Sequence, residues 1–579
     1  MKLRSLGFCF LCVLSAAAGN AFSLDREAFT FTKYDLEVRV EPEQQRLGAR
    51  GTITLRNDSP TPQKIAVLQI SSSLDWRSIR AGGKQLQFVS QPYTSDIDHT
   101  GALSEAVVTL PEAIAPKGTV DLEIAYEGVI VLDATRLARL GTPEDAARSA
   151  DWDQINTKFT AVRGAGNVAW YPIATDAADL AEPNGLFDVV GRLKARESAS
   201  KMHFRMEETG QGEPPQIFVG GAMCMVTLIE QVGLNHHLIA DCKALPLGPI
   251  VPMLVIASYA VLERPDITVH YFHGHDAGAT AYAEAAERVA PLLVEWFGGM
   301  ERKAETTDLA DPSAAPVESG AFLLTPLASI DPKLAGLMAA HQLTHAAFSS
   351  QRPWINEGLA HFAQALYLEH QRGRQAALDY MGLHRSAFSS PEEEKQTTAP
   401  RSEEEVNRSL INTANEELYR SKAMCVWWML RDMIGDQALK KALASYHPDE
   451  DQEPSYMPHL IQAQTQRDLE WFFDDWVYRD RGLPEFKVES AFTRKTLPEG
   501  YMLTITVANL GAAGAEVPLT IKFSGGEVTQ RLVVRGKSKG VIRIAVPKPP
   551  EEIVVNDGSV PESDLTNNRF KMEAGDASK

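Results

Sequence analysis

The sequence predicts a multidomain α+β fold, with a β-rich N-terminal part, a mainly helical middle and a second β-rich part at the end. Apolar residues alternate in the first part, recur at helical spacing from about residue 264, and alternate again from about residue 484. A chain of 579 residues is also too long to fold around one hydrophobic core. We therefore expect three folded domains.

The composition is that of a globular protein with a strong acidic charge. Hydrophobic residues make up 44% of the chain and charged residues 23%, which is ordinary for folded domains. The formal net charge of −19 repels nucleic acid and anionic lipid surfaces, so we expect neither as a partner.

Residues 1–21 have the pattern of a secretory signal peptide. Lys2 and Arg4 supply the positive start, Leu6–Ala17 the apolar core, and Gly19–Ala21 a small-residue cleavage site. We expect export to a periplasm or to the extracellular space. No later stretch approaches the roughly 20 apolar residues of a membrane helix, so we expect no membrane span in the mature chain.

Residues 27–263 are predicted to form a β-saddle or a sandwich of two sheets. Four segments alternate apolar and polar residues or are rich in β-branched side chains: Tyr34–Val40, Gly48–Leu55, Lys64–Ile70 and Val120–Tyr126. We place the end of this domain just before Arg264 and Pro265.

Three cysteines remain after removal of the signal: Cys224, Cys242 and Cys425. Cys224 and Cys242 flank two apolar runs around a turn at residues 233–235, so hairpin pairing would place them opposite each other. In an oxidising compartment they would form a disulfide, and the alternative is two small buried residues. Cys425 lies in an apolar helical stretch, where we expect a core thiol.

Residues 264–482 change to helical periodicity, and residues 484–572 return to alternation. The middle part is predicted to contain helices at Ala277–Phe297, Ala335–Phe348, Trp354–Leu368 and Ala423–Ala444. Residues 390–407 are rich in proline and glutamate, which is typical of a solvated loop. About seven short strands predict an immunoglobulin-like β-sandwich for the last domain, followed by a polar tail at 573–579.

Two histidines on one predicted helix are candidate metal ligands. The helix is predicted to start at Asp331 and Pro332, as N-cap and first-turn residue. His341 and His345 are four positions apart and therefore point to the same side, where both imidazoles can reach one ion. Two partly buried histidines without a metal are the alternative.

A carboxylate at the start of the next predicted helix completes the candidate site. Glu357 lies in the first turn after Arg352 and Pro353, and packing of the two helices would bring it to the histidines. Two imidazoles and one carboxylate leave a tetrahedral zinc ion one open position, the arrangement of catalytic rather than structural zinc.

This stretch resembles the His-Glu-x-x-His … Trp-Leu-Asn-Glu-Gly-Phe-Ala pattern of the membrane alanyl aminopeptidase family of gluzincins. Residues 354–360, Trp-Ile-Asn-Glu-Gly-Leu-Ala, match its second half almost position for position. The resemblance implies a thermolysin-like zinc domain at 264–482, with one Zn²⁺ per chain held by His341, His345 and Glu357. It also implies a peptide or protein as substrate or ligand.

Two further segments resemble the family more loosely. Gly320 and Ala321 match the Gly-Ala of its substrate-binding element, and Tyr419–Ala423 resembles the segment whose tyrosine stabilises the transition state. By this resemblance Tyr419 is a candidate oxyanion donor. A core tyrosine is the alternative, because the matching position in strict register is Arg420.

The departure with the clearest chemical consequence is Gln342. The family has a glutamate here, which takes a proton from zinc-bound water and returns it to the leaving amine. An amide can hold water by hydrogen bonds but cannot accept that proton. Loss of a general base costs about 10²–10⁴-fold in rate, so we expect impaired catalysis.

Recognition of a substrate's free amino end is also altered. Leu323 stands where the family has the amine-binding glutamate, and Glu318, on the other side of the turn, is a candidate replacement. His361 follows Glu357 by four positions, a spacing compatible with an approach to the site, but a satisfied, partly buried histidine is the favoured interpretation.

Three functions are compatible with these residues. The first is an exported zinc metallopeptidase with slow or altered chemistry. The second is a catalytically dead pseudopeptidase that keeps zinc and binds peptides or a partner. The third is a metal-free structural remnant, which the three intact ligand types disfavour. The first two functions differ in whether Gln342 slows hydrolysis or abolishes it.

Overall fold

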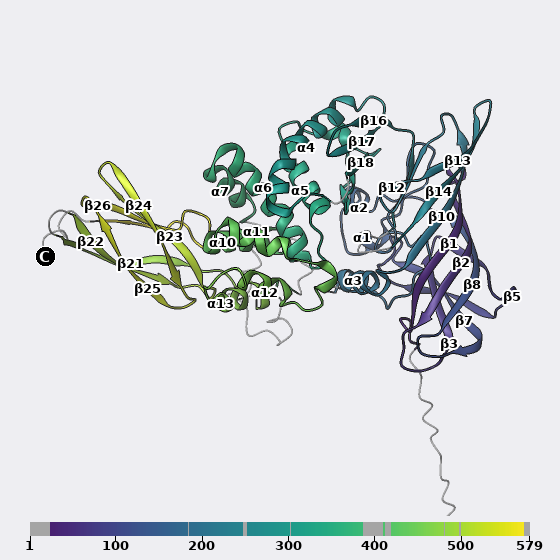
Figure 1. Ribbon diagram of the computed structural model, residues 1–579, viewed down its shortest axis with the longest axis horizontal. Helices are drawn as coiled ribbons and strands as arrows, with labels where there is room; N and C mark the ends of the chain where they lie inside the picture. Colours follow the sequence, from purple (N-terminus) through teal and green to yellow (C-terminus); the bar gives the residue numbers. More distant parts are fainter. Residues whose placement is uncertain are drawn as a thin grey trace, which may run out of the picture.

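The computed structural model describes residues 24–182, 185–246, 252–300, 303–385, 409–411, 418–479, 481–496 and 500–572. The predicted signal peptide, the loop at 390–407 and the polar tail lie outside the described residues. Sheets form one end of the elongated molecule, helices occupy its middle, and the C-terminal strands form the other end (Figure 1). The predicted multidomain α+β fold is confirmed.

The N-terminal part is built mainly from strands β1 (Phe29–Glu41), β2 (Arg46–Asn57), β3 (Gln63–Ser71), β4 (Leu74–Ala81), β5 (Lys84–Gln85), β6 (Phe88–Thr94), β7 (Ala102–Ile114), β8 (Thr119–Val129), β9 (Thr160–Val162), β10 (Lys201–Gln211), β11 (Gln216–Val219), β12 (Ala222–Met223), β13 (Met225–Val232), β14 (Asn235–Pro246) and β15 (Leu254–Ala257). They form three sheets, in the orders β13-β14-β10-β1-β2-β8-β4-β5, β3-β7-β6 and β12-β11-β15-β9. In β1, Leu36 and Val38 are buried while Glu37 and Arg39 are exposed, as alternation predicts. The first two sheets share one apolar core.

Three helices that the periodicity does not predict also lie in this part: α1 (Thr135–Arg139), α2 (Glu144–Ala150) and α3 (Gly185–Glu197). Helices α1 and α2 have only 5 and 7 residues, so each offers few apolar repeats against which a helical period could be recognised, whereas α3, with 13 residues, was missed despite its length. Helix α3 is tied to the large sheet, because the Tyr34 hydroxyl on β1 donates a hydrogen bond to the Glu197 carboxylate at 3.1 Å.

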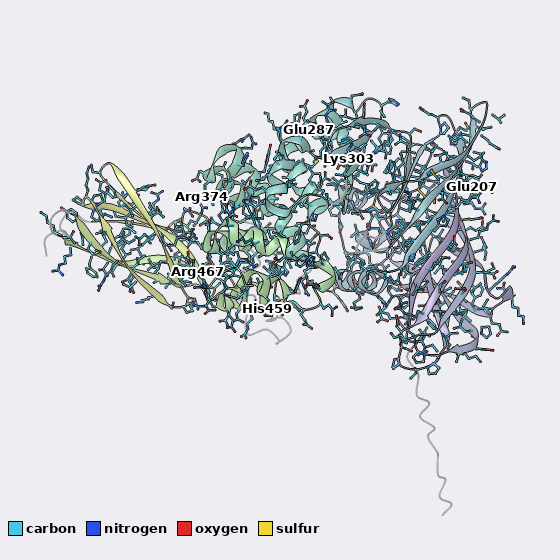
Figure 2. The ribbon with its side chains drawn as sticks, in the orientation of Figure 1. Glu207, Glu287, Lys303, Arg374, His459 and Arg467 are labelled. Atoms are coloured by element: carbon cyan, nitrogen blue, oxygen red, sulfur yellow. A yellow bond between two sulfur atoms is a disulfide. The ribbon has the colours of Figure 1, made fainter. Side chains whose placement is uncertain are left out.

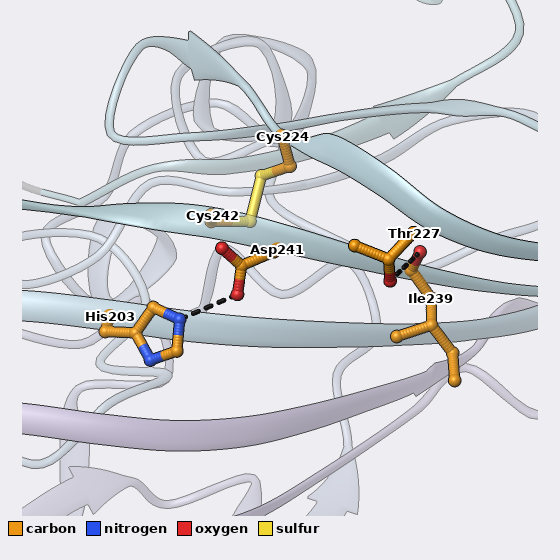
Figure 3. Close-up of a disulfide and its surroundings, with 6 residues drawn as sticks. All are labelled: His203, Cys224, Thr227, Ile239, Asp241 and Cys242. Atoms are coloured by element: carbon orange, nitrogen blue, oxygen red, sulfur yellow. Dashed lines mark hydrogen bonds and ion pairs between the residues drawn. A yellow bond between two sulfur atoms is a disulfide. The ribbon is translucent and has the colours of Figure 1, made fainter.

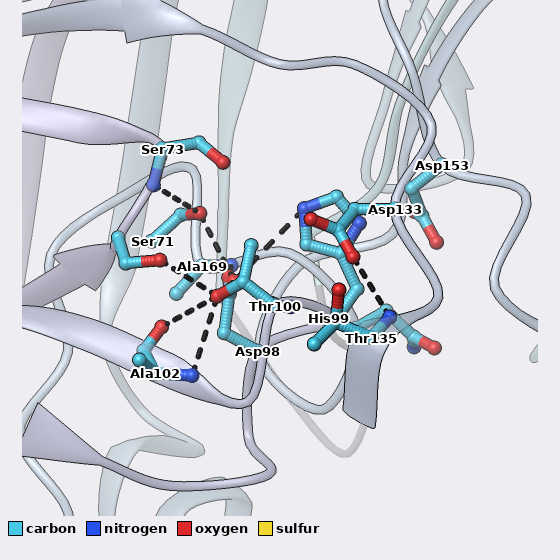
Figure 4. Close-up of polar contacts among 12 residues, drawn as sticks. Ser71, Ser73, Asp98, His99, Thr100, Ala102, Asp133, Thr135, Asp153 and Ala169 are labelled. Carbon is cyan, nitrogen blue, oxygen red and sulfur yellow. Dashed lines mark hydrogen bonds and ion pairs between the residues drawn. The ribbon is translucent and has the colours of Figure 1, made fainter. Parts of the chain in front are cut away.

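A fully buried carboxylate, Asp98, joins loops of the N-terminal part (Figure 4). It accepts hydrogen bonds from the hydroxyls of Ser71 at 3.1 Å and Thr100 at 2.8 Å, and from the backbone N–H of Ala169 at 3.0 Å. Burial raises the pKa of Asp98, and these bonds oppose that rise by favouring the charged form. The cluster fixes the end of β3 against two loops.

A disulfide joins Cys224 and Cys242 at the open end of the β13–β14 hairpin (Figure 3). The two Cα atoms are 4.5 Å apart, and the hairpin pairs Met225 with Asp241 immediately beside them. The predicted bridge is therefore confirmed. Cys425 is a buried free thiol, as predicted, and burial raises its pKa to about 12.

The middle part contains a five-stranded sheet with the order β16-β17-β18-β20-β19. Its strands are β16 (Ala260–Glu263), β17 (Ile267–Tyr271), β18 (Ala304–Asp308), β19 (Val317–Ser319) and β20 (Phe322–Thr325). Because β16 pairs with β17, this sheet begins before residue 264, where we placed the domain boundary. Strand β19 is the edge strand, and it forms a hairpin with β20.

The helices of the middle part are α4 (Asp276–Phe297), α5 (Ala335–Ala347), α6 (Pro353–Arg372), α7 (Arg374–Leu383), α10 (Ala423–Ile434), α11 (Asp436–Ala444), α12 (Tyr456–Gln462) and α13 (Glu470–Phe473), with π-helical turns η3 (Leu418–Lys422) and η5 (Asp474–Tyr478). The predicted helix at 423–444 is two helices, because Gly435 has a φ of 84° and ends the first. Within the described residues, no helix combines the length and the apolar character that crossing a membrane requires.

Helix α5 starts at Ala335, not at Asp331 as predicted. The Asp331 carboxylate accepts a hydrogen bond from the backbone N–H of Lys333 at 2.9 Å, which closes a local turn. The backbone N–H of Leu334 bonds to the carbonyl of Asp331 within the same turn. The carbonyl of Asp331 also accepts from the backbone N–H of Ala335, so Asp331 makes the contacts of an N-cap residue although regular helix begins at Ala335.

The C-terminal part has two sheets, β21-β22-β25 and β24-β23-β26-β27. Its strands are β21 (Phe486–Lys495), β22 (Tyr501–Asn509), β23 (Ala515–Phe523), β24 (Gly526–Val534), β25 (Lys539–Val546), β26 (Pro550–Val555) and β27 (Arg569–Lys571). Their apolar core is continuous with that of the helices. Ion pairs join the helices to the C-terminal strands: Arg531 lies 3.1 Å from Asp432, and Arg467 contacts Glu516. Arg467 is labelled in Figure 2, as is Arg374.

Candidate metal centre

The three predicted ligands meet between α5, which carries His341 and His345, and the first turn of α6, which carries Glu357. Nε2 of His345 lies 3.3 Å from Nε2 of His341 and 3.4 Å from Oε1 of Glu357. Nε2 of His341 lies 3.7 Å from Oε2 of Glu357. Donors of a tetrahedral zinc ion, with bonds of about 2.0–2.1 Å, are about 3.3–3.4 Å apart. The donor set therefore fits a zinc ion.

The start of α6 positions the carboxylate. Pro353 occupies the first helical position, where its missing N–H costs nothing, and Trp354 and Ile355 are fully buried and anchor the first turn. The Asn356 side chain links the helix to its surroundings, with Nδ2 3.0 Å from Nδ1 of His345 and Oδ1 accepting from the backbone N–H of Ser350. The contact packs the amide of Asn356 against the His345 ring, and a metal on Nε2 would place the ring proton on Nδ1, so the amide would have to turn its oxygen toward the ring.

The surroundings of His341 favour its neutral imidazole. Burial, followed by the positive charges of His345 and Arg420, holds the pKa of His341 well below its usual range. A neutral imidazole is the form that binds a metal. Nε of Arg420 lies 3.3 Å from Oε2 of Glu357, so a guanidinium also borders the centre.

Gln342 is 1% exposed and is held in one orientation by three hydrogen bonds. Its Oε1 accepts from the hydroxyls of Tyr282 at 2.6 Å and Thr325 at 2.9 Å, and its Nε2 donates to Oε1 of Glu318 at 3.1 Å. The position of the family's general base therefore carries a hydrogen-bond donor. Tyr282 and Thr325 were not predicted from the sequence. The one signal for each is a hydroxyl group within an otherwise apolar segment.

Glu318 faces the candidate ligands themselves. A carboxylate oxygen of Glu318 and one ring nitrogen each of His341 and His345 all lie within 4.8 Å of one another. Leu323, which pairs with Glu318 across the β19–β20 hairpin, is fully buried. Burial raises the pKa of Glu318, and the carboxylate of Glu357 raises it further. From the sequence, Glu318 is a candidate only for binding a substrate amine.

The remaining predicted site residues are Gly320, Ala321 and Tyr419. Gly320, with a φ of 58°, and Ala321 form the turn between β19 and β20. Tyr419 is 2% exposed and packs in the helical core, whereas the next residue, Arg420, contacts Glu357. The roles of Gly320 and Ala321 in substrate binding and of Tyr419 as oxyanion donor stay predictions.

His361 lies one turn after Glu357, on the side of α6 that faces the centre. Donor atoms of His341, Glu357 and His361 all lie within 4.8 Å of one another, and the rings of His341 and His361 are 4.9 Å apart between centroids. Burial holds the pKa of His361 well below its usual range. His361 is partly buried, as favoured from the sequence, and it also approaches the site, the alternative that its spacing of four from Glu357 indicates.

Residues 348–476 match the family model described as the peptidase family M1 domain, and this segment includes Glu357 and α6. This segment is therefore similar to the catalytic domain of M1 peptidases. The resemblance to aminopeptidase-like gluzincins is thereby confirmed. No curated protein matches the sequence.

Solved structures of M1 zinc metallopeptidases share the fold. One from Deinococcus radiodurans has a TM-score of 0.52 and 17% identity, over 78% of this chain and 94% of that one. A mutant from the same organism, bound to a Tyr-Ser-Ala substrate, has a TM-score of 0.51 and 16% identity over the same shares. A two-domain M1 zinc metallopeptidase mutant bound to L-tryptophan has a TM-score of 0.52 and 17% identity, over 79% of this chain and 96% of that one.

Proposed function

We propose that this protein is an exported, zinc-binding relative of M1 peptidases that acts on peptides and whose hydrolysis is impaired by Gln342. The observation that carries the proposal is the fixed amide of Gln342 beside three convergent metal ligands. A glutamate at this position would accept a proton, whereas Gln342 presents N–H groups. A loss of about 10²–10⁴-fold in rate follows from the missing base.

His341, His345 and Glu357 would hold one Zn²⁺ per chain. When bound, zinc polarises a peptide carbonyl as a Lewis acid and lowers the pKa of bound water. The side chain of Arg420 is 43% exposed and borders the centre, so its guanidinium can donate a hydrogen bond to a substrate oxygen. This would give Arg420 the task that the family assigns to a tyrosine.

A peptide is the class of ligand that we propose. Two of the similar structures hold a Tyr-Ser-Ala substrate and L-tryptophan. The edge strand β19 lies beside the centre, and an edge strand offers backbone groups to an extended peptide. The buried Leu323 leaves no carboxylate at the matched amine-binding position, so the proposal does not extend to aminopeptidase specificity.

Export is supported by two features at different places in the chain. Residues 1–21 have the composition of a signal peptide. The Cys224–Cys242 disulfide is a bond that persists in oxidising compartments. A periplasmic or extracellular location satisfies both.

A catalytically dead pseudopeptidase that binds peptides or a partner is the second candidate. The hydrogen bond between Gln342 and Glu318 favours this second candidate. The amide and the carboxylate are hydrogen-bond partners of each other, so neither needs a catalytic water as a partner. Zinc would then hold the centre together or contact the bound peptide without supporting turnover.

The test restores a glutamate at position 342 without creating a carboxylate pair. In Q342E alone, two carboxylates would stand where the amide and Glu318 now lie 3.1 Å apart, and one would stay protonated. The double variant Q342E/E318Q exchanges the two groups and keeps their hydrogen bond. Hydrolysis of a peptide panel is measured for wild type, E318Q and the double variant.

We expect slow hydrolysis by wild type and E318Q, and a gain of about 10²-fold or more in the double variant. Fast turnover by wild type would show that Gln342 does not impair catalysis. A double variant that binds zinc and still cleaves no peptide would rule out the peptidase interpretation and leave the binding protein.

A further inference from the structure

The carboxylate of Glu318 has no part in the proposed function beyond its bond with Gln342. We infer that Glu318 is a fourth protein ligand of the metal ion, so that two imidazoles and two carboxylates fill its coordination sphere. This inference rests on the proposed function, because it takes the centre of His341, His345 and Glu357 as a zinc site.

The geometry places the carboxylate within reach of the ion. Three elements meet at the centre, with the histidines on α5, Glu357 on α6 and Glu318 on β19. A carboxylate oxygen of Glu318 lies within 4.8 Å of a nitrogen of each histidine, so a side-chain rotation on binding can bring it to the ion. Oε1 of Glu318 accepts the hydrogen bond from Gln342, so the second oxygen of the carboxylate is the one that can bind the metal ion.

The local charges also favour a cation at this point. The carboxylates of Glu318 and Glu357 both lie against the two histidines, and the guanidinium of Arg420 contacts Glu357 at 3.3 Å. Two neighbouring carboxylates with restricted access to water are unfavourable without a positive charge between them. A divalent ion shared by both carboxylates and both imidazoles removes this conflict.

A fourth protein ligand changes what the centre can do. Catalytic zinc has three protein ligands and an open position, whereas structural zinc has four. With Glu318 bound, water or a peptide carbonyl reaches the ion only when this carboxylate leaves it, which adds to the slow hydrolysis expected of wild type. Ligation by Glu318 and the replacement of the general base by Gln342 would therefore both lower peptidase activity.

Zinc affinity tests this ligand. Competition with a chromophoric chelator is measured for full-length wild type, E318Q, H341A and E287Q, the last being an exposed glutamate on α4 that serves as a matched control (Figure 2). We expect E318Q to weaken zinc binding by more than about 100-fold, beyond the loss that second-layer residues cause, and E287Q to change nothing. A smaller loss in E318Q, while H341A loses zinc, overturns this inference alone. If H341A keeps its zinc, the proposed centre is wrong as well.

Azide binding tests closure on the wild-type protein and so does not depend on the stability of a variant. The visible spectrum of cobalt(II) in place of zinc responds to its ligands. We expect azide to leave the spectrum of the cobalt-substituted wild type unchanged and to shift that of E318A, where a water would take the vacated position. A shift in wild type would reveal an open position and overturn the inference.

Discussion

Polar side chains around the candidate centre are buried, and burial of a polar group costs free energy unless it finds a partner. Gln342 has three partners and His345 is contacted by Asn356. Nδ1 of His361 is buried and has no hydrogen-bond partner among the described residues, although the ring lies against His341. A cation at the centre would compensate part of this cost, so metal and stability should be coupled.

We therefore expect zinc removal to lower the melting temperature. At free zinc 100-fold above its Kd, binding stabilises the native state by about 2.7 kcal/mol. The response should be absent in H345A and intact in H370A, which replaces an exposed histidine at the end of the same helix, α6. Thermal melts with and without a chelator measure this, and an unchanged wild-type melt would contradict it.

The ligands could be predicted from sequence because their signals are local. His341 and His345 are one helical turn apart, and Glu357 follows a proline at a helix start. The partners of Gln342 could not be predicted, since Glu318 lies 24 positions away and Tyr282 lies 60 positions away on other elements. Only the folded sheet and helices bring them together.

Helices α6 and α10 pack closely at Gly358, the residue after Glu357. A Cβ at Gly358 would lie 2.7 Å from Cβ of Ala423 and 3.0 Å from Nε1 of Trp427. G358A should therefore push α6 away from α10, at a cost of about 1–3 kcal/mol in the free energy of unfolding. Chemical denaturation measures this cost.

G382A is the matched control, because a Cβ at Gly382 on α7 would meet nothing within 4 Å. There alanine should stabilise the helix by up to about 1 kcal/mol through its higher helix propensity. Equal effects of the two substitutions would show that the close packing at Gly358 does not limit stability.

The contact between α3 and β1 predicts a pH dependence. Burial raises the pKa of Glu197 from its usual 4.5 to about 7. Because the folded pKa lies above the unfolded one, the stability that Glu197 contributes is present below about pH 4.5 and is lost as pH rises to about 7. Relative to wild type, E197Q should gain up to about 3 kcal/mol across this window and level off above it.

Denaturation at several pH values between 4 and 8 measures the difference between E197Q and wild type. E144Q, which removes an exposed partner of Arg148 on α2, is the control, and its free energy of unfolding should stay within about 0.5 kcal/mol of wild type at every pH. A constant difference for E197Q as well would mean that Glu197 titrates normally in the folded protein.

At the scale of the whole molecule, the order of the three parts along the chain could be predicted from the sequence. The strand pairings that join distant segments or set the domain boundary could not. Alternation marks β1 and β22, and helical spacing marks α4, because each pattern lies within one element. The parallel pairing of β1 with β10 joins segments far apart in the chain, and no local pattern encodes it. The same holds for β16, whose pairing with β17 assigns it to the middle sheet.

The distribution of apolar cores predicts how the molecule unfolds. One core fills the N-terminal sheets, whereas a second runs without interruption from the helices into the C-terminal strands. A small apolar cluster, which includes Phe218 and Phe322, connects the N-terminal and middle parts. We expect two calorimetric transitions, one for the N-terminal part and one for the helices and C-terminal strands together.

Two perturbations assign these transitions. Reduction of the Cys224–Cys242 bridge, which closes a loop with a sequence separation of 18, should cost about 3 kcal/mol and lower only the N-terminal transition. Zinc should raise only the other transition, because the proposed ligands lie on α5 and α6. A single transition that responds to both would mean that the small cluster around Phe218 is strong enough to couple the two cores.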